Sequence, residues 1–311
     1  MSQLPETGGP HPSPQQVIAI KGLSAILMSM CFVLRYSIHR KLPQNFNTRL
    51  CNLLIAGAIV LDMGSSVSSI WVMTEEIKEP YRFQVWGLTE KVRKALYATH
   101  TLYFLSLAFI KGAYLVYFAE LARGAVHSRK RYLSHIAAAI YISTTFVGLF
   151  MLLLWCRPFY HNYRGITFKN YLQCPSQYNR TVFITTSVLN IISDLAILAV
   201  PFTLITTLFR FESSRCFKRA ALLFVFAVGV LSIVATAVRM AVILGNLDSF
   251  GLLPWGLMRT AMVLSHVEVF AAILAITLPS VGKVVAVAVG ARCDPWIAAA
   301  KTGAPLGGGA S

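Results

Sequence analysis

The chain of 311 residues is too apolar for a soluble globular domain, because 56% of its residues are hydrophobic, 13% are charged and the mean hydropathy is +0.63. Its formal net charge of +16 does not by itself indicate nucleic acid. In a membrane protein, basic loops held at the anionic cytoplasmic leaflet explain the same excess. We therefore predict an integral membrane protein that contacts membrane lipids and no nucleic acid.

Seven apolar runs follow one another along the chain, and each reaches the roughly 20 residues that a helix needs to cross a bilayer. The alternating pattern of a β-barrel strand is absent. The sequence thus predicts an all-α membrane protein, a seven-transmembrane helix bundle. The predicted spans are Val17–Tyr36, Thr48–Met73, Leu96–Glu120, Leu133–Cys156, Thr181–Phe209, Ala220–Gly245 and Leu257–Val281.

Three parts of unequal length are expected from the composition. Residues 1–16 have no basic segment and no cleavage site after a short apolar core, so we expect a disordered N-terminus and no cleaved signal peptide. The bundle is expected over residues 17–283. Residues 284–311 end in a Gly- and Ala-rich stretch and are expected to form a low-complexity tail.

The basic residues indicate an orientation. If the N-terminus lies outside, the inner loops and tail carry about fifteen Lys and Arg residues and the outer segments about ten, which is the direction of the positive-inside rule. We therefore expect an extracellular N-terminus and a cytoplasmic C-terminus.

The loop after the fourth span carries two signals of an oxidising, extracytoplasmic location. Cys156 and Cys174 flank it and could form a disulfide there, and Asn179 begins the glycosylation sequon Asn-Arg-Thr. Two unpaired thiols and an unused sequon are the alternative, since Asn179 lies close to the start of the fifth span. Both alternatives stay open on the sequence alone.

The fifth span carries an acid in the middle of an apolar run. Asp194 lies one helical turn after Asn190 and about two turns before Pro201, so the three fall on one face of the helix. A charged group at mid-bilayer costs at least ~2.5–3.5 kcal/mol on insertion scales. Asp194 should therefore face other helices and have a partner.

Five ionisable residues lie inside the predicted spans and form a candidate intramembrane charge network: Asp62, Lys111, Asp194, Arg239 and Glu268. Four of them fall near mid-depth, and Arg239 lies nearer the outer end. A pair between Lys111 and Asp194, or between Lys111 and Glu268, is the simplest arrangement. Such a network either only fixes helix packing or takes part in ligand binding, ion binding or switching, and intramembrane charge favours the second. Lys21, near the outer end of the first span, is interpreted as an interface anchor.

The order of these elements resembles the fungal rhodopsin-like domain, a family of seven-helix fungal membrane proteins. The third span has the lysine of SLAFIKGAYLVYF, and CRPFYHNYRG and YLQCPS supply the two loop cysteines. The fifth span has NIISDLAILAVPFTLITTL, which is the most specific match. The sixth has ATAVRM and the seventh SHVEVFAAILAITLP. The resemblance implies a receptor-like protein of the plasma membrane.

The chain also departs from that pattern. The second span reads TRLCNLLIAGAIVLD, where the family often has paired acids and a tryptophan. Tyr160, His161 and Tyr163 stand where the family's outer loop usually has a tryptophan, and no long tail or cysteine-rich ectodomain is present in the sequence.

The first functional hypothesis is a receptor-like sensor of an unknown extracellular cue that signals to a cytoplasmic partner. Coupling to a G protein is an analogy from fold alone, because neither Asp-Arg-Tyr after the third span nor Asn-Pro-x-x-Tyr in the seventh occurs. The alternative is a transporter or channel that uses the buried charges.

A cofactor and an enzymatic activity are not expected. Retinal needs a lysine inside the seventh span, and Leu257–Val281 has none. A zinc hydrolase would need converging histidines, but His100, His135 and His266 are predicted at different depths.

Overall fold

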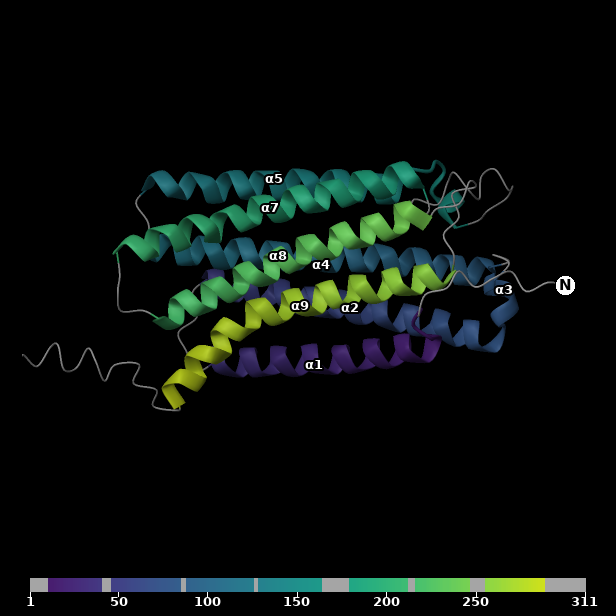
Figure 1. Cartoon of the computed structure of the whole chain (residues 1–311), viewed down its shortest axis with the longest axis horizontal. Coiled ribbons are helices and arrows are strands. Elements are labelled where there is room, and N and C mark those ends of the chain that lie inside the picture. The colour runs from purple at the N-terminus through teal and green to yellow at the C-terminus, as the bar shows by residue number, and fades with distance from the viewer. Residues whose placement is uncertain are drawn as a thin grey trace, which may run out of the picture.

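The computed structural model describes residues 11–40, 46–84, 88–125, 128–163, 179–211, 216–246 and 255–288. Its elements are helical throughout this part of the chain, and Figure 1 labels them. They are α1 (Pro14–Arg40), α2 (Phe46–Lys78), α3 (Pro80–Gln84), α4 (Glu90–Ala125), α5 (Ser128–Leu154), the 3-10 turn η1 (Phe159–Asn162), α7 (Arg180–Phe211), α8 (Cys216–Asn246) and α9 (Trp255–Ala288).

Seven of these helices are long and apolar enough to cross a membrane, within the described ranges. They are α1, α2, α4, α5, α7, α8 and α9, and each matches one of the predicted spans, although α5 ends at Leu154, before the predicted end at Cys156. The predicted seven-helix fold is therefore confirmed. The helices run several residues beyond the apolar runs, because a helix needs no apolar side chains once it has left the hydrocarbon core.

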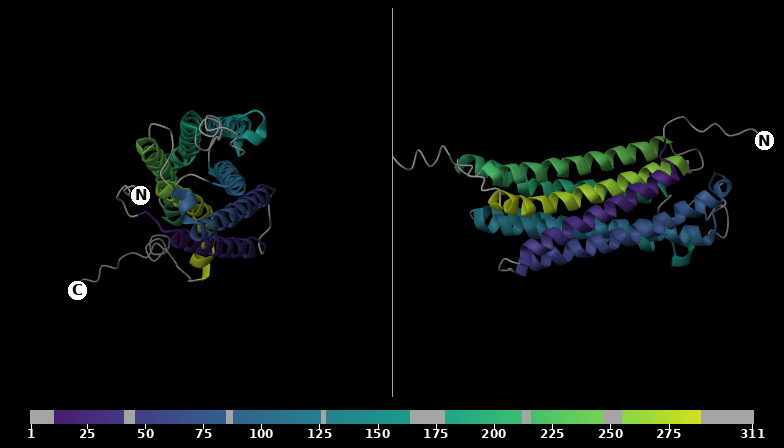
Figure 2. Two further views of the ribbon diagram at one scale, coloured as in Figure 1. Left: turned by 90° about the vertical axis from the view of Figure 1, so that its right-hand side faces the viewer. Right: turned by 90° about the horizontal axis from the view of Figure 1, so that it is seen from below.

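The spans pack in chain order around a closed ring, with α1 next to α2, α5 next to α7, α7 next to α8, and α9 returning to α1. Helix α4 is the exception, since it packs against α2, α5, α7 and α9. The end view in Figure 2 shows this arrangement of the bundle. A side chain on α4 can therefore reach four other spans, which makes this helix the natural carrier of a central polar group.

Small residues bring α2 and α4 close together. The Ser65, Ser68 and Ser106 hydroxyls donate to main-chain carbonyls across this interface at 2.9–3.1 Å, so these three hydroxyls are matched. At Gly57, an added Cβ would lie 2.7 Å from the Phe109 ring, which is closer than Cβ atoms normally approach. The serine-rich face of α2, with Ser65, Ser66 and Ser69 buried, therefore faces the bundle.

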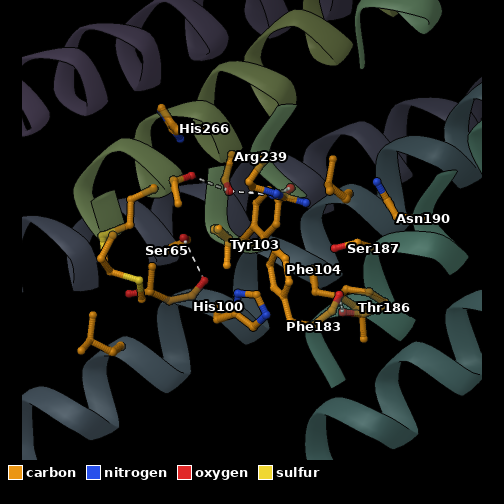
Figure 3. Close-up of a pocket in the computed structure, with 18 of the residues that line it drawn as sticks. Ser65, His100, Tyr103, Phe104, Phe183, Thr186, Ser187, Asn190, Arg239 and His266 are labelled. Carbon is orange, nitrogen blue, oxygen red and sulfur yellow. Dashed lines mark hydrogen bonds between the residues drawn. The ribbon is translucent and has the colours of Figure 1, made fainter. Parts of the chain in front are cut away.

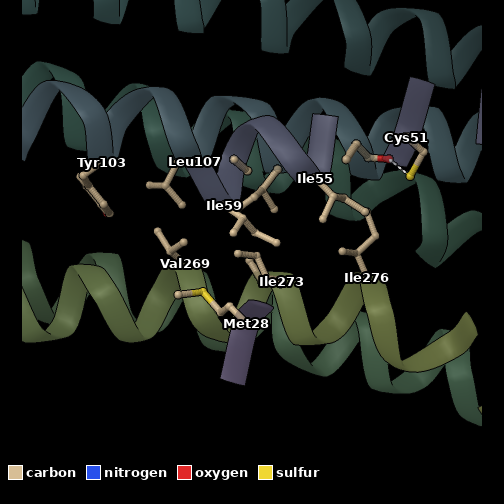
Figure 4. Close-up of a cluster of buried hydrophobic side chains, with 13 residues drawn as sticks. Met28, Cys51, Ile55, Ile59, Tyr103, Leu107, Val269, Ile273 and Ile276 are labelled. Carbon is tan, nitrogen blue, oxygen red and sulfur yellow. Dashed lines mark hydrogen bonds between the residues drawn. The ribbon is translucent and has the colours of Figure 1, made fainter. Parts of the chain in front are cut away.

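The largest apolar cluster lies between α1, α2, α4 and α9 (Figure 4). Ile55, Ile59, Leu107, Ile273 and Ile276 are almost completely buried in it. Because lipid tails are as apolar as these side chains, their contribution comes from close packing and not from exclusion of water. The cluster positions α4 and α9 beside each other for the polar site described below.

Two helix starts are fixed by side-chain caps. The Ser13 hydroxyl accepts from the Gln16 main-chain N–H at 3.2 Å, and the Gln16 side chain accepts from the Ser13 N–H at 2.9 Å, a capping box followed by Pro14 at the first helical position. Asn179 caps α7, with its side-chain oxygen accepting from the N–H groups of Thr181 and Val182 at 3.0 and 3.3 Å. The sequon asparagine thus has a structural role at the helix start.

Three expectations concern the outer loop and the termini, which the structure describes only in part. Cys156 is buried just after α5, and Cys174 lies in residues 164–178, outside the described residues. The disulfide, the glycosylation of Asn179 and the two terminal segments therefore stay predictions. So does the orientation in the membrane. We call the end of the bundle at which α1, α4, α7 and α9 begin, on the right in Figure 1, the N-terminal end.

Candidate functional site

A buried lysine on α4 is held by one turn of α7. The Lys111 ammonium lies 2.8 Å from an Asp194 carboxylate oxygen, and both side chains are about nine-tenths buried. It also donates to the Asn190 side-chain oxygen at 2.6 Å and to the Ser193 hydroxyl at 2.7 Å. Asn190 and Asp194 are four residues apart, so the helical repeat places both on the face towards α4. All three donor positions of the ammonium are used.

A second charged pair lies between α8 and α9. Arg239 and Glu268 approach to 3.7 Å, and the Tyr103 hydroxyl on α4 lies between them. That hydroxyl donates to Glu268 at 2.7 Å and accepts from Arg239, whose guanidinium also donates to the Ser265 hydroxyl at 2.7 Å. Hydrogen bonds with an ionised partner are the stronger kind, so this bridge holds three helices together.

Asn190 connects the two pairs. Its side-chain amide donates to the Thr236 hydroxyl at 3.2 Å, and that hydroxyl donates to Glu268 at 3.1 Å. Longer contacts of 3.5 Å run from the same amide to Asp194 and to Glu268. The result is one polar chain from α4 through α7 and α8 to α9. We call Lys111, Asn190, Asp194, Thr236, Glu268, Tyr103 and Arg239 the core network.

Four of the five predicted charges therefore come together: Lys111, Asp194, Arg239 and Glu268. Of the two pairings left open by the sequence, the structure has Lys111 with Asp194. Arg239 reaches the network although its backbone was predicted nearer the outer end, because its side chain is long enough to extend to Tyr103 and Glu268.

The fifth predicted residue, Asp62, lies outside the core network. It is 1% exposed, and one carboxylate oxygen lies 3.3 Å from His266 Nδ1 on α9. The other ring nitrogen, Nε2, lies 2.5 Å from the Ser24 hydroxyl on α1. This Ser–His–Asp row does not make a nucleophile, since the Ser24 hydroxyl also donates to its own helix at Ile20 O and does not line the cavity described next.

Lys21 does not act as an interface anchor, which corrects the interpretation from sequence. The residue is 2% exposed and turns inward towards α2 and α9. Depth alone suggested that its ammonium could reach the interface, but the face of α1 on which it lies is the one packed into the bundle. Asp62 is the charged group that acts on it.

A cavity of about 100 Å³ lies between the core network and the N-terminal end of the bundle. Figure 3 draws the residues that line it. We call it the N-terminal cavity. All the spans except α5 line it. Figure 3 shows His266 and Ser65 at one side, Thr186, Ser187 and Asn190 at the other, and Tyr103 and His100 between them. Apolar side chains complete the lining: Leu96, Phe104, Leu107, Phe183, Ile243, Met258 and Met262.

Several polar groups that line this cavity have no protein partner among the described residues. Asp62 Oδ2, Thr99 Oγ1 and Arg239 Nε are buried without a hydrogen bond, and the Lys21 ammonium makes none either. A buried polar group without a partner costs about 1–3 kcal/mol, and more when it is charged. Groups of this kind around an enclosed space are suited to water or to a polar ligand.

Two smaller cavities lie beside the Lys111–Asp194 pair. One of about 50 Å³ is lined by Lys111, Asp194, Pro201 and Ser232, and one of about 20 Å³ by Lys111, Asn190 and Ser193. Pro201 lies inside α7, on the face that carries Asp194, as its spacing predicted. Asn190 lines both the 20 Å³ space and the N-terminal cavity. No group of three metal-ligating side chains lies close enough to hold a metal ion in the described part of the chain.

The sequence matches the fungal rhodopsin domain family over residues 32–287, which is more than half of the chain. The chain belongs to this family. The match begins within α1 and ends within α9, so the core network and nearly all of the N-terminal cavity lie inside the family domain. No curated protein and no solved structure gives a significant match.

The pairing of Lys111 with Asp194 predicts strongly non-additive stability effects. Lys111→Met or Asp194→Asn should each lower the free energy of unfolding by about 3–5 kcal/mol, because each leaves one buried charge unpaired. The double variant should recover much of that loss. Thermal unfolding in detergent micelles measures all three.

The matched control is the pair Lys94–Glu90, which has the same 2.8 Å separation but lies on the surface, with side chains 51% and 40% exposed. Lys94→Met and Glu90→Gln should each cost at most about 1 kcal/mol. A double variant at Lys111 and Asp194 whose loss equals the sum of the single losses would show that these residues do not stabilise the fold as a pair.

Proposed function

We propose that this family member is a receptor-like sensor, in which a small extracellular ligand binds in the N-terminal cavity and the core network carries its effect inward. The observation that supports the proposal is the position of unmatched polar groups in a cavity directly above a continuous polar chain. Arg239, Tyr103 and Asn190 belong to both.

The core network has the connections that such a sensor needs. A ligand that contacts Arg239 or Asn190 changes the hydrogen bonds of Glu268 and Lys111, since each shares a direct or single-residue link with them. These residues join α4, α7, α8 and α9, so a ligand with different affinity for two arrangements of the pairs would shift how four helices pack. In this proposal the core network is the element that has two arrangements, and ligand binding in the N-terminal cavity shifts the balance between them.

The proposed orientation places the N-terminal cavity on the extracellular side and the basic loops in the cytoplasm, at the plasma membrane. A cytoplasmic signalling partner is then expected at the opposite end. Coupling to a G protein stays an analogy from fold. In this orientation the loop after α5 is extracellular, where a Cys156–Cys174 disulfide would hold it and Asn179 would be accessible for glycosylation.

We do not propose retinal or an enzymatic function. The Lys111 amine is occupied by Asp194, Asn190 and Ser193, so it is not available to form a Schiff base. Lys283 belongs to α9 but follows Val281, the last residue of the predicted seventh span.

A transporter or channel is the second candidate, because the three cavities share lining residues. Leu107 lines all three, and Lys111 lines the two smaller ones. An ion or proton path could follow this row. Lys111, which lines the two smaller cavities, is held by its ion pair with Asp194.

Flux measurement separates the two candidates. Purified protein in liposomes should conduct protons, sodium and potassium no faster than protein-free liposomes, because the paired charges fill the middle of the bundle. Gramicidin-treated liposomes give the positive control. A flux that the wild-type chain supports and Lys111→Met alters would contradict the sensor and support the transporter.

The orientation has its own test in intact cells that produce the protein. An epitope tag placed before Pro5 should be accessible without permeabilisation, and mass spectrometry of non-reduced protein should find Cys156 and Cys174 joined in one peptide pair. A tag that is detected only after permeabilisation would reverse the orientation and place the cavity on the cytoplasmic side.

A further inference from the structure

Two buried cations and one partly buried cation lie against a carboxylate in the described part of the bundle. Lys111 contacts Asp194 at 2.8 Å, Arg239 lies 3.7 Å from Glu268, and Arg259 on α9 lies 2.9 Å from Glu76 on α2. Such direct pairing is what the cost of unpaired charge in a bilayer requires. Lys21 is the exception that faces the N-terminal cavity.

Lys21 and Asp62 line the same cavity without touching. No nitrogen–oxygen contact within 4.0 Å joins the Lys21 ammonium to any carboxylate of the described residues, although Asp62 is the charge that acts on it. Asp62 uses one oxygen for His266, and its second oxygen, Oδ2, has no partner. Both residues are at least 98% buried, with exposed fractions of 2% and 1%.

The hydrogen bonds that link Asp62, His266 and Ser24 can all form with a neutral His266 ring. If Nδ1 carries the proton and donates to Asp62, Nε2 accepts from the Ser24 hydroxyl when that hydroxyl turns its single proton from Ile20 O to the ring, and a neutral imidazole is then matched at both nitrogens. Asp62 and Lys21 then face the cavity as groups of opposite sign that act on each other. The space between them therefore offers a donor on one side and an acceptor on the other, with no net charge.

The Lys21 ammonium and Asp62 Oδ2 together favour a hydroxyl as the polar group of the ligand. A hydroxyl can accept from the Lys21 ammonium and donate to Asp62 Oδ2 at the same time, and both bonds then have an ionised partner, which makes them strong. A carboxylate would match Lys21 and be repelled by Asp62. An ammonium would match Asp62 and be repelled by Lys21. An ether could accept from Lys21 but would leave Asp62 Oδ2 unmatched.

The rest of the cavity wall favours a ligand whose remaining part is apolar. Away from Lys21 and Asp62 its walls carry Phe104, Leu107, Ile243, Met258 and Met262, which suit an apolar chain, and the volume of about 100 Å³ limits its size. We propose that the N-terminal cavity binds a small, uncharged alcohol whose hydroxyl lies between Lys21 and Asp62. The inference rests on the ligand-binding role of the cavity proposed above and names its ligand class.

The test compares four probes that share one hydrocarbon chain: n-hexanol, hexanoate, hexylamine and hexyl methyl ether. The thermal unfolding midpoint of the purified full chain is followed over a concentration series of each, which gives an apparent dissociation constant. Wild-type protein should bind n-hexanol about tenfold or more tightly than the other three, because each of these leaves a buried charged group unmatched or repelled.

Two variants should change this preference in opposite directions. In Asp62→Asn the lysine charge is no longer balanced, so hexanoate should gain about tenfold or more relative to n-hexanol. In Lys21→Gln the aspartate is no longer balanced, so hexylamine should gain by the same factor. Lys94→Gln removes a lysine outside the cavity and should leave the wild-type order unchanged, which controls for partition of the probes into the micelle.

The possible failures are distinguishable. If wild-type protein prefers hexanoate or hexylamine, and Lys21→Gln or Asp62→Asn removes that preference, the alcohol assignment is wrong while the cavity remains a ligand site. If none of the probes shifts the wild-type midpoint more than it shifts that of the cavity-blocked Ser187→Trp variant, both the alcohol assignment and the ligand-binding role are contradicted. Should a charge variant fail to fold, the order of the four probes on wild-type protein still decides the ligand class.

Discussion

The ammonium of Lys111 sets the arrangement of the whole bundle. A charge in the middle of a bilayer must be matched inside the protein, and Lys111 lies on α4, the helix with the most spanning neighbours. Its three donor positions are matched from one turn of α7, by Asn190, Ser193 and Asp194. Once this contact is made, the rotation of α7 against α4 is fixed, and its remaining polar atoms point towards α8 and α9.

The second pair follows from the first. The Asn190 amide faces Thr236, and Thr236 donates to Glu268, which in turn meets Tyr103 and Arg239. Glu268 accepts hydrogen bonds at both oxygens from donors on three other helices. Both oxygens of Glu268 are therefore matched. In the N-terminal cavity, Lys21 and Asp62 both line the wall and lie more than 4.0 Å apart.

Much of this could be predicted from the sequence. Length and hydropathy were enough for the seven spans, since a bilayer leaves few alternatives to a helix. The spacing of Asn190, Asp194 and Pro201 predicted one shared face of α7, and the sign pattern reduced the partner of Lys111 to two carboxylates. What the sequence could not supply was the rotation of each helix about its own axis, which decides between Asp194 and Glu268 as that partner.

The errors and omissions have the same origin. Lys21 was interpreted from its depth as an anchor, although the face on which it lies is buried against α2 and α9. Tyr103 carries no charge, so nothing in the sequence marked it as the bridge between Arg239 and Glu268. His266 was weighed only as a metal ligand, whereas its contacts are with Asp62 and Ser24. In each case the deciding fact is a contact between helices far apart in the sequence.

The central claim is that Asn190 joins the two charged pairs into one network. The most direct test is the interaction energy between Lys111→Met and Glu268→Gln, measured by thermal unfolding with Asn190 present and again with Asn190→Ala. With Asn190 present, the two substitutions should be non-additive by about 0.5–3 kcal/mol. With Asn190→Ala, they should add to within about 0.3–0.5 kcal/mol. An interaction energy that is unchanged when Asn190 is removed would contradict the account.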